Sequence, residues 1–267
     1  MNVIERNNVR VSGTGPQTML FAHGFGCDQN MWRYVAPAFA DRYRVVLFDY
    51  VGSGQSEKAH YDRDRYASLE GYAQDVLDVV HALDLRNVTF VGHSVSSMIG
   101  VLAANREPER FERLILIGPS PRYINDDGYV GGFERADIDG LFEMMDKNFI
   151  GWANFLAPAI MKNADRPDLS EELTASFCST DPIIARNFAE ATFYADNRGD
   201  LGNVSIPSLI LQCSDDMVAP FAVGDYLHSH LPGSTLRVMS ANGHCPHMSH
   251  PDETIALIEE YLGATDA

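Results

Sequence analysis

The stretch of sequence that decides the fold is Val88-Thr-Phe-Val-Gly-His-Ser-Val-Ser-Ser-Met98. An apolar run over residues 88–91 ends at Gly92, and small residues with a helical pattern follow Ser94. This order predicts a strand, a tight turn and a helix, with the Ser94 hydroxyl exposed at the turn near a helix N-terminus. The pattern is G-x-S-x-S instead of the usual G-x-S-x-G, so an ordinary turn with a capping serine is the alternative.

Five other short apolar runs end in a glycine or a polar loop in the same way. Together the six runs predict strands that are buried on both faces of a sheet. They cover residues 18–22, 44–48, 88–91, 114–117, 209–212 and 235–239. Helical patterns over 69–83, 97–105 and 251–262 alternate with these runs. The sequence therefore predicts an α/β protein with a mostly parallel, doubly wound sheet, whose sites lie at the carboxyl ends of the strands.

Residues 122–198 interrupt this alternation, because they show no strand pattern and are rich in aromatic residues and methionine. Asp181 followed by Pro182 is typical of a helix N-cap and first turn. We expect several helices inserted between two strands, forming a lid over the strand ends, although plain helix–helix packing explains most of these apolar residues. The expected domains are an α/β core, residues 1–121 and 199–267, and a helical lid, residues 122–198.

A serine nucleophile needs a histidine base, which a carboxylate holds in the right tautomer. In strand–turn–serine folds these residues follow in the order Ser, Asp, His, and this chain supplies that order after predicted strands. For the acid we favour Asp216, with Asp215 as the alternative. For the base we favour His244, with His247 and His250 as the alternatives.

Hydrogen-bond donors must stabilise the negative charge that develops on the carbonyl attacked by Ser94. The backbone N–H of Val95 is one expected donor. Phe25, in the loop His23-Gly-Phe-Gly26, supplies the other, because glycines let the main chain approach a substrate. An ordinary strand-ending turn is the alternative for this loop. Since each strand-end loop carries a residue that the same reaction needs, we expect a nucleophilic triad.

The histidines near residue 250 also raise the hypothesis of a zinc site, but their spacing does not favour it. His247 and His250 have H-x-x-H spacing instead of the i,i+4 spacing of a helical metal site, and Pro246 interrupts the segment. We expect no metal and no cofactor. His93, beside the serine, is expected to be packed or hydrogen-bonded and not catalytic.

The composition predicts a soluble globular protein with an acidic surface. Of 267 residues, 45% are hydrophobic and 21% are charged, and the net charge is -17, which disfavours nucleic acid and anionic membranes as partners. No stretch approaches the roughly 18 apolar residues of a membrane span. The first residues turn polar at once, unlike a signal peptide, and the four cysteines form no C-x-x-C pair. We expect a cytoplasmic monomer with free thiols.

Six blocks of sequence carry a resemblance that runs nearly from end to end. They are His23-Gly-Phe-Gly-Cys-Asp-Gln29, Phe48-Asp-Tyr-Val-Gly-Ser-Gly54, Gly92-His-Ser-Val-Ser96, Gly131-Gly-Phe-Glu134, Cys178-Ser-Thr-Asp-Pro182 and Gly243-His-Cys-Pro-His-Met-Ser-His-Pro-Asp-Glu253. In these blocks the chain resembles the RsbQ-like α/β-hydrolases. RsbQ, the bacterial protein that gives this family its name, is a positive regulator of stress sigma-factor activity. The plant karrikin and strigolactone receptors are its relatives.

The resemblance implies a role for individual residues. The nucleophile, acid and base positions of the family match Ser94, Asp216 and His244, and its oxyanion-hole positions match Phe25 and Val95. It also implies a four-helix lid over a small hydrophobic pocket. The serine at position 96 departs from the bacterial regulator's glycine but is similar to the plant receptors.

We therefore expect a serine hydrolase that acts on a small hydrophobic ester or lactone, such as a butenolide. The expected pocket residues are Phe25, Tyr123, Phe133, Phe155, Phe193 and Val218. The resemblance also implies an alternative, a ligand-sensing regulator of a stress-signalling pathway, with slow hydrolysis and a PAS-domain phosphatase as partner. A dehalogenase or epoxide hydrolase is disfavoured because it needs a carboxylate nucleophile, whereas a cofactor-free haloperoxidase or a C–C bond hydrolase shares the triad.

Overall fold

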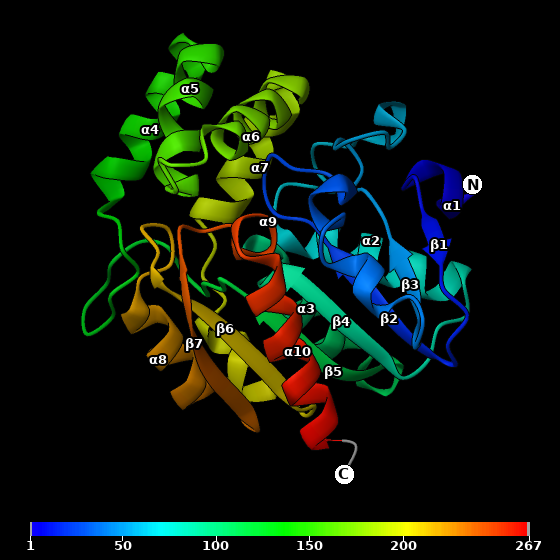
Figure 1. The fold of residues 1–267 in the computed structure, drawn as a ribbon. Coiled ribbons are helices and arrows are strands. Elements are labelled where there is room, and N and C mark those ends of the chain that lie inside the picture. Colours follow the sequence, from blue (N-terminus) through cyan, green and yellow to red (C-terminus); the bar gives the residue numbers. More distant parts are fainter. Residues whose placement is uncertain (1, 266–267) are drawn as a thin grey trace.

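The computed structural model describes residues 2–265 and contains a seven-stranded sheet with helices on both faces (Figure 1). The strands are β1 Arg10–Ser12, β2 Gln17–Ala22, β3 Tyr43–Leu47, β4 Val88–His93, β5 Phe111–Ile117, β6 Ser208–Asp215 and β7 Ser234–Asn242. They lie in the order β1-β3-β2-β4-β5-β6-β7. Only the β1–β3 pair is antiparallel among the described strands. This is the mostly parallel α/β architecture that the sequence predicts.

Two apolar cores lie on opposite faces of the sheet. In β2, Met19 and Phe21 belong to one core and Leu20 and Ala22 to the other, and all four are fully buried. The covering helices are α10 (Pro251–Thr265) on the first face, and α2 (Leu69–Ala82), α3 (Val95–Arg106) and α8 (Phe221–His230) on the second. Since both faces are covered, the central strands have continuous apolar sequences instead of alternating ones.

The two edge strands differ from the sequence prediction. β1 is three residues long and all three are exposed, so no apolar pattern reveals it. β7 buries Met239 and Ala241 on one face, while Val238 is 51% exposed on the other, so this strand is not buried on both faces as expected. β6 and β7 also extend further than predicted, because Asp215 still pairs with Asn242.

Four helices between β5 and β6 lie above the carboxyl ends of the strands (Figure 1). They are α4 Arg135–Lys147, α5 Phe149–Met161, α6 Pro167–Ser179 and α7 Pro182–Phe193. The Asp181 carboxylate accepts the backbone N–H groups of Ile183 and Ile184 at 2.9 and 3.3 Å, so α7 begins as the sequence predicts. Two short helices, α1 Val3–Arg6 and α9 Pro246–Ser249, complete the α-helices of the described chain.

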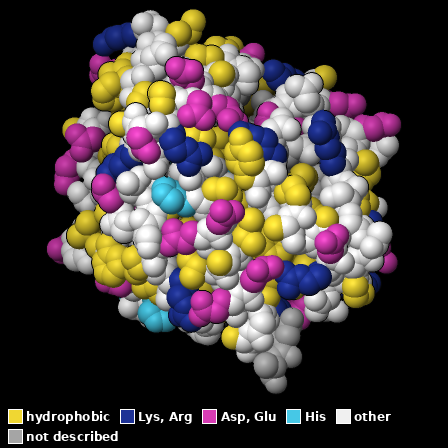
Figure 2. Space-filling model, in the orientation of Figure 1, with side chains coloured by type: hydrophobic (Ala, Val, Ile, Leu, Met, Phe, Trp, Pro, Cys, Tyr) yellow, Lys and Arg dark blue, Asp and Glu magenta, His cyan; other side chains and the backbone are white. Residues whose placement is uncertain are grey.

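The lengths of the helices and the charges on one face of the surface can be compared with the sequence prediction. Within residues 2–265, no helix is both long and apolar enough to cross a membrane. Acidic and basic side chains are interspersed with apolar ones over the face shown in Figure 2. The excess of acidic residues is therefore not gathered into one patch on this face.

Candidate active site

Ser94 lies in the turn between β4 and α3, and its backbone is strained. Its φ of 57° and ψ of -125° fall in a region that residues other than glycine rarely adopt. The Ser94 N–H donates to the carbonyl oxygen of Ile117 at 2.8 Å, which anchors the turn to β5. A Cβ on Gly92 would lie 2.7 Å from the carbonyl oxygen of Ser96, so the tight approach of helix to strand requires glycine there.

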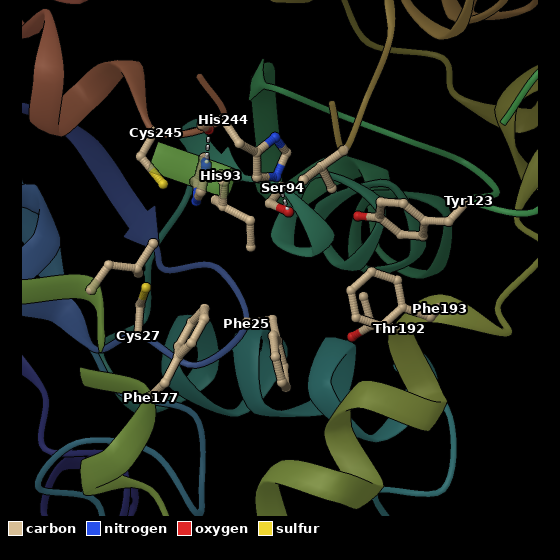
Figure 3. Close-up of a pocket in the computed structure, with 13 residues that line it drawn as sticks. Phe25, Cys27, His93, Ser94, Tyr123, Phe177, Thr192, Phe193, His244 and Cys245 are labelled. Carbon is tan, nitrogen blue, oxygen red and sulfur yellow. Dashed lines mark hydrogen bonds between the residues drawn. The ribbon is translucent and has the colours of Figure 1, made fainter. Parts of the chain in front are cut away.

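Three side chains from separate strand-end loops form one hydrogen-bonded chain. His244 Nε2 lies 2.7 Å from Ser94 Oγ, and a dashed line marks this contact in Figure 3. His244 Nδ1 lies 2.7 Å from Asp216 Oδ2. All three residues are buried. Because Ser94 follows β4, Asp216 follows β6 and His244 follows β7, the parallel sheet brings them to the same edge.

The environment of Asp216 keeps its carboxyl group ionised. Oδ1 accepts the backbone N–H groups of Val218 at 2.8 Å and Ala219 at 3.1 Å. Burial alone raises the pKa of Asp216, but His244 and these two amides outweigh burial and hold that pKa below its usual value. An ionised carboxylate keeps the proton of His244 on Nδ1, so Nε2 is left to accept the proton of the serine hydroxyl.

The alternative acid and bases lie away from the serine hydroxyl. Asp215 has a side chain that is 68% exposed and pairs with Lys162. His247 is fully buried against Trp32, with ring centroids 4.7 Å apart, whereas His250 is partly exposed to solvent. Neither histidine contacts the serine hydroxyl. Among the described residues, no group of three or more His, Cys, Asp or Glu side chains converges as metal ligands would.

Two backbone N–H groups near Ser94 have no hydrogen-bond acceptor among residues 2–265. Val95 is the first residue of α3, where the helix itself provides no acceptor. Phe25 follows Gly24 in the loop after β2, and a Cβ on Gly24 would lie 3.5 Å from the Cβ of Ser94. The two loops that carry these N–H groups therefore meet beside the serine.

A largely apolar cavity opens over Ser94, with about 400 Å³ of space including its mouth. The strand-end loops form one wall, and α5, α6 and α7 form the other (Figure 3). The lining residues are Phe25, Cys27, His93, Ser94, Tyr123, Ile160, Leu173, Phe177, Thr192, Phe193, Val218, His244 and Cys245. Such a cavity suits a small hydrophobic molecule.

Two of the expected pocket residues do not line this cavity. Phe155 is 57% exposed, because the buried residues of α5 form one face of the helix and Phe155 falls outside it. Phe133 packs half-buried beside α4 and borders a separate surface groove, together with Phe155. The other four expected residues line the cavity: Phe25, Tyr123, Phe193 and Val218.

Several residues that line the cavity were not predicted from the sequence. Cys27 and Cys245 stand within two residues of predicted site residues, so their position was a usable signal. Ile160, Leu173 and Phe177 come from helices whose faces the sequence pattern did not assign, and no local signal identifies them.

Two hydroxyl groups in the cavity have no hydrogen-bond partner among the described residues. They are the Tyr123 hydroxyl, which points toward Ser94 in Figure 3, and Thr192 Oγ1. Burial raises the pKa of Tyr123, so its phenol stays protonated and can donate. Because buried polar groups normally find a partner, these two hydroxyls are available to a bound molecule.

One aromatic ring joins the loop after β2 to the helices above it. The ring of Phe25 lies 6.1 Å from Trp152 on α5, 5.9 Å from Phe177 on α6, and 5.6 and 6.1 Å from Phe188 and Phe193 on α7. Rings at these separations attract one another beyond the burial of their area. The residue that carries one of the N–H groups near Ser94 is therefore also a contact point for the helices.

The sequence matches the alpha/beta hydrolase fold over residues 17–251. It is 40% identical to the strigolactone esterase D14 of Arabidopsis thaliana over 262 residues, which cover 98% of each chain. It is 39% identical to the karrikin insensitive 2 receptor CA of Petunia hybrida over 261 residues, which cover 97% of each chain. Among solved structures, a hydrolase from Oleispira antarctica is 46% identical, with a TM-score of 0.96 over 98% of this chain and 96% of that one.

Proposed function

The chain belongs to the alpha/beta hydrolase fold family, and we propose that it is a serine hydrolase that cleaves a small hydrophobic ester or lactone. The observation that carries this proposal is the continuous chain of 2.7 Å contacts from Ser94 through His244 to Asp216, at the base of an apolar cavity. A buried serine, a base and an ionised acid in this arrangement are the parts that acyl transfer requires.

The first half of the reaction follows from this geometry. His244 Nε2 takes the hydroxyl proton of Ser94 as Oγ attacks the carbonyl carbon of the substrate. Asp216 stabilises the imidazolium that forms. The N–H groups of Phe25 and Val95 bind the carbonyl oxygen as it becomes negative, and each such donor typically lowers the barrier by about 2.7–4 kcal/mol. His244 then returns the proton to the leaving oxygen, and the acyl group stays on Ser94.

In the second half, water replaces the leaving group. His244 takes a proton from the water molecule, whose oxygen attacks the acyl carbon, and Ser94 leaves with the proton from His244. For a lactone the leaving oxygen remains tethered to the acyl group, so one ring-opened hydroxy acid is released. No cofactor enters this sequence of steps.

The cavity favours a particular class of substrate. Its walls are mostly aromatic and aliphatic, so apolar ring or alkyl groups bind well. The unpartnered hydroxyls of Tyr123 and Thr192 favour a molecule with an oxygen atom besides the scissile ester, as a substituted butenolide has. In this proposal, residues 122–198 act as a lid, whose helices α5 to α7 keep water away from the bound substrate.

A second candidate function is ligand sensing with slow hydrolysis. Its support is the 39% identity to a petunia protein named as a receptor, together with the helices over the cavity, which a partner could contact. By the sequence resemblance, that partner would be a PAS-domain phosphatase. In this function, ligand binding changes the helical surface, and turnover is incidental.

Replacement of the nucleophile tests the proposal. With p-nitrophenyl acetate and a butenolide lactone as substrates, we expect Ser94→Ala to lower kcat by at least about 10⁴-fold. Its melting temperature should stay close to that of the wild type, because the residue is small and lies in a turn. Wild-type turnover in the variant would refute the serine mechanism. If the wild type binds lactones in thermal-shift assays but hydrolyses neither compound, the sensing function is the better account.

A further inference from the structure

Two buried side chains flank Ser94 and have no step in the proposed mechanism. His93 comes just before the serine and is 2% exposed, and Ser96 comes two residues after it and is fully buried. His93 Nε2 lies 2.7 Å from the carbonyl oxygen of His244. Ser96 Oγ lies 2.5 Å from the carbonyl oxygen of His23. The turn thus holds one carbonyl from the loop with the base and one from the loop that leads to Phe25.

We propose that His93 and Ser96 are positioning residues, which hold two loops in place relative to the nucleophile. His93 fixes the loop that carries His244, here called the base loop, and Ser96 fixes the loop His23-Gly-Phe-Gly26, here called the oxyanion loop. This inference rests on the proposed function, since it assigns a role in the same reaction. Neither side chain needs to touch the substrate to act in this way. Each acts through the main chain of a loop whose other atoms meet the reacting group.

The direction of the His93 bond follows from its partners. A carbonyl oxygen can only accept, so His93 Nε2 donates and His93 Nδ1 carries no proton. Burial and the neighbouring His244 lower the pKa of His93 to about 3, so the ring is neutral with a single donor. Its Nδ1 edge faces the oxyanion loop, where a Cβ on Gly24 would lie 2.5 Å from it. The ring is therefore wedged between the two loops that it aligns.

The direction of the Ser96 bond follows from the carbonyl group, and it also sets the role of a third residue. The Tyr50 hydroxyl lies 2.8 Å from Ser96 Oγ. Since the carbonyl oxygen of His23 can only accept, the single proton of Ser96 goes to it, and Tyr50 must donate to Ser96. This chain of three groups locks the peptide between His23 and Gly24, directly before the N–H of Phe25. Glycine, usual at position 96 in this motif, could not form either bond.

The required precision explains why such bonds matter. A displacement of about 1 Å at a reacting group can cost about 10²-fold in rate. The N–H of Phe25 and the imidazole of His244 both belong to loops, which a sheet holds less firmly than its own strands. Hydrogen bonds from the buried turn to these loops keep all three components in one geometry.

Ser96 and Ser97 form a matched pair for a test. Ser97 is also fully buried, but its Oγ donates to the carbonyl oxygen of Gly92 at 3.1 Å, which joins α3 to the end of β4 and reaches neither of the two loops. We expect Ser96→Ala to lower kcat toward p-nitrophenyl acetate by about 10-fold to 100-fold with little change in KM. Ser97→Ala should keep kcat close to the wild-type value. Equal kcat values in the two variants would overturn the role of Ser96.

His93→Gln and His93→Met form the second pair. Glutamine places an amide N–H at nearly the same reach as His93 Nε2, whereas methionine has a similar length and no donor. We expect His93→Met to lose at least about 10-fold in kcat with KM nearly unchanged, and His93→Gln to recover most of this loss. Equal kcat in both variants would overturn the role of His93. If His93→Met does not fold, the kcat of His93→Gln is compared with that of the wild type. A fall in kcat of about 10²-fold in His93→Gln, which keeps the N–H donor, would count against the role of the hydrogen bond.

A separate measurement distinguishes failure of this inference from failure of the proposed function. A fluorophosphonate probe should label the wild type at Ser94. If the wild type is labelled and the four variants react at the wild-type rate, positioning by His93 and Ser96 is wrong while the serine mechanism stands. If the wild type is not labelled and hydrolyses no ester, the proposed function is wrong, and the inference falls with it.

Discussion

The two walls of the cavity are held in place by different forces. On the sheet side, directional hydrogen bonds fix the polar side chains: Asp216 accepts three of them, and His244 uses both ring nitrogens. On the helix side, the residues that face the cavity are held mainly by ring packing, centred on Phe25 and Phe193. Hydrogen bonds define angles and distances, whereas ring contacts tolerate small shifts. The comparison suggests that the sheet side determines the chemistry and that the helix side determines which molecule enters.

The largest expected effect comes from the acid on the sheet side. Asp216→Asn keeps the shape of the side chain but loses the charge that keeps the His244 proton on Nδ1. We expect kcat to fall by about 10⁴-fold, as for the loss of a triad aspartate charge elsewhere. Initial rates with p-nitrophenyl acetate would measure this fall.

The neighbouring aspartate provides the control. Asp215 is exposed and pairs with Lys162, so Asp215→Asn should leave kcat nearly unchanged. If the two asparagine variants lost activity equally, the assignment of the acid to Asp216 would fail.

The second expected effect is a loss of stability between pH 7.5 and pH 5 that arises from buried histidines on the sheet side. His23, His93 and His247 are buried there and have lowered pKa values, chiefly because of burial, whereas residues 122–198 contain no histidine. In the unfolded chain a histidine takes up a proton near pH 6.5, and in the folded protein these rings do so only at lower pH. Their neutral form therefore contributes full stability above about pH 6.5, and stability falls as the pH drops below this value.

His247 is the residue of choice for testing this effect, because it forms no side-chain hydrogen bond among the described residues and packs against the ring of Trp32. His247→Leu should reduce the pH dependence of the unfolding free energy by up to about 1.4 kcal/mol per pH unit below pH 6.5. Urea unfolding at several pH values between 7.5 and 5 would measure the slope. An unchanged slope would show that His247 does not stay neutral in the folded protein.

A smaller effect is expected at the two unpartnered hydroxyls that line the cavity. Tyr123→Phe and Thr192→Val remove the unpartnered hydroxyls with little change in shape. For a butenolide that carries a further oxygen atom, we expect KM to rise by about 2-fold to 10-fold, the usual value of one hydrogen bond. Steady-state kinetics would show this rise for the butenolide and not for p-nitrophenyl acetate. A rise of the same size for both substrates would mean that the hydroxyls do not bind the additional oxygen.

The smallest effect is expected on the outer surface of the helices. Phe155 is 57% exposed and lies away from the cavity, so Phe155→Ser should change stability by no more than about 0.5 kcal/mol and leave the kinetics unchanged. Phe177 is 2% exposed and lines the cavity, and Phe177→Ala should cost about 3–5 kcal/mol of stability. Denaturant unfolding of the two variants would measure the difference. A large loss in Phe155→Ser would reveal a contact that the structure does not contain.

The sequence was sufficient for the buried central strands and for grouping the residues at the strand ends, for a physical reason. Apolar runs mark the buried strands, and parallel strands bring their carboxyl ends together, so Ser94, Asp216 and His244 could be grouped without coordinates. The structure explains why the acid is Asp216 and not Asp215. Strand β6 continues through Asp215, whose side chain points to solvent, so the next residue faces His244. The exposed strand β1 left no apolar pattern to detect.

The helix side was less predictable. The aromatic residues of 122–198 are all apolar by type, and only the packing of four helices determines which of them face the cavity. Phe193 does, whereas Phe133 and Phe155 do not. The bonds of His93 and Ser96 to distant carbonyls likewise join residues up to 151 positions apart, which no local pattern reveals.

The most direct test of the account is to locate the acyl group during turnover. The protein would be mixed with a slowly hydrolysed p-nitrophenyl ester, quenched in acid and digested, and the modified peptide sequenced by mass spectrometry. We predict one acyl group, attached to the oxygen of Ser94, in an amount that equals the burst of p-nitrophenol. Hydrolysis with a burst but with the acyl group on another residue would contradict the central claim.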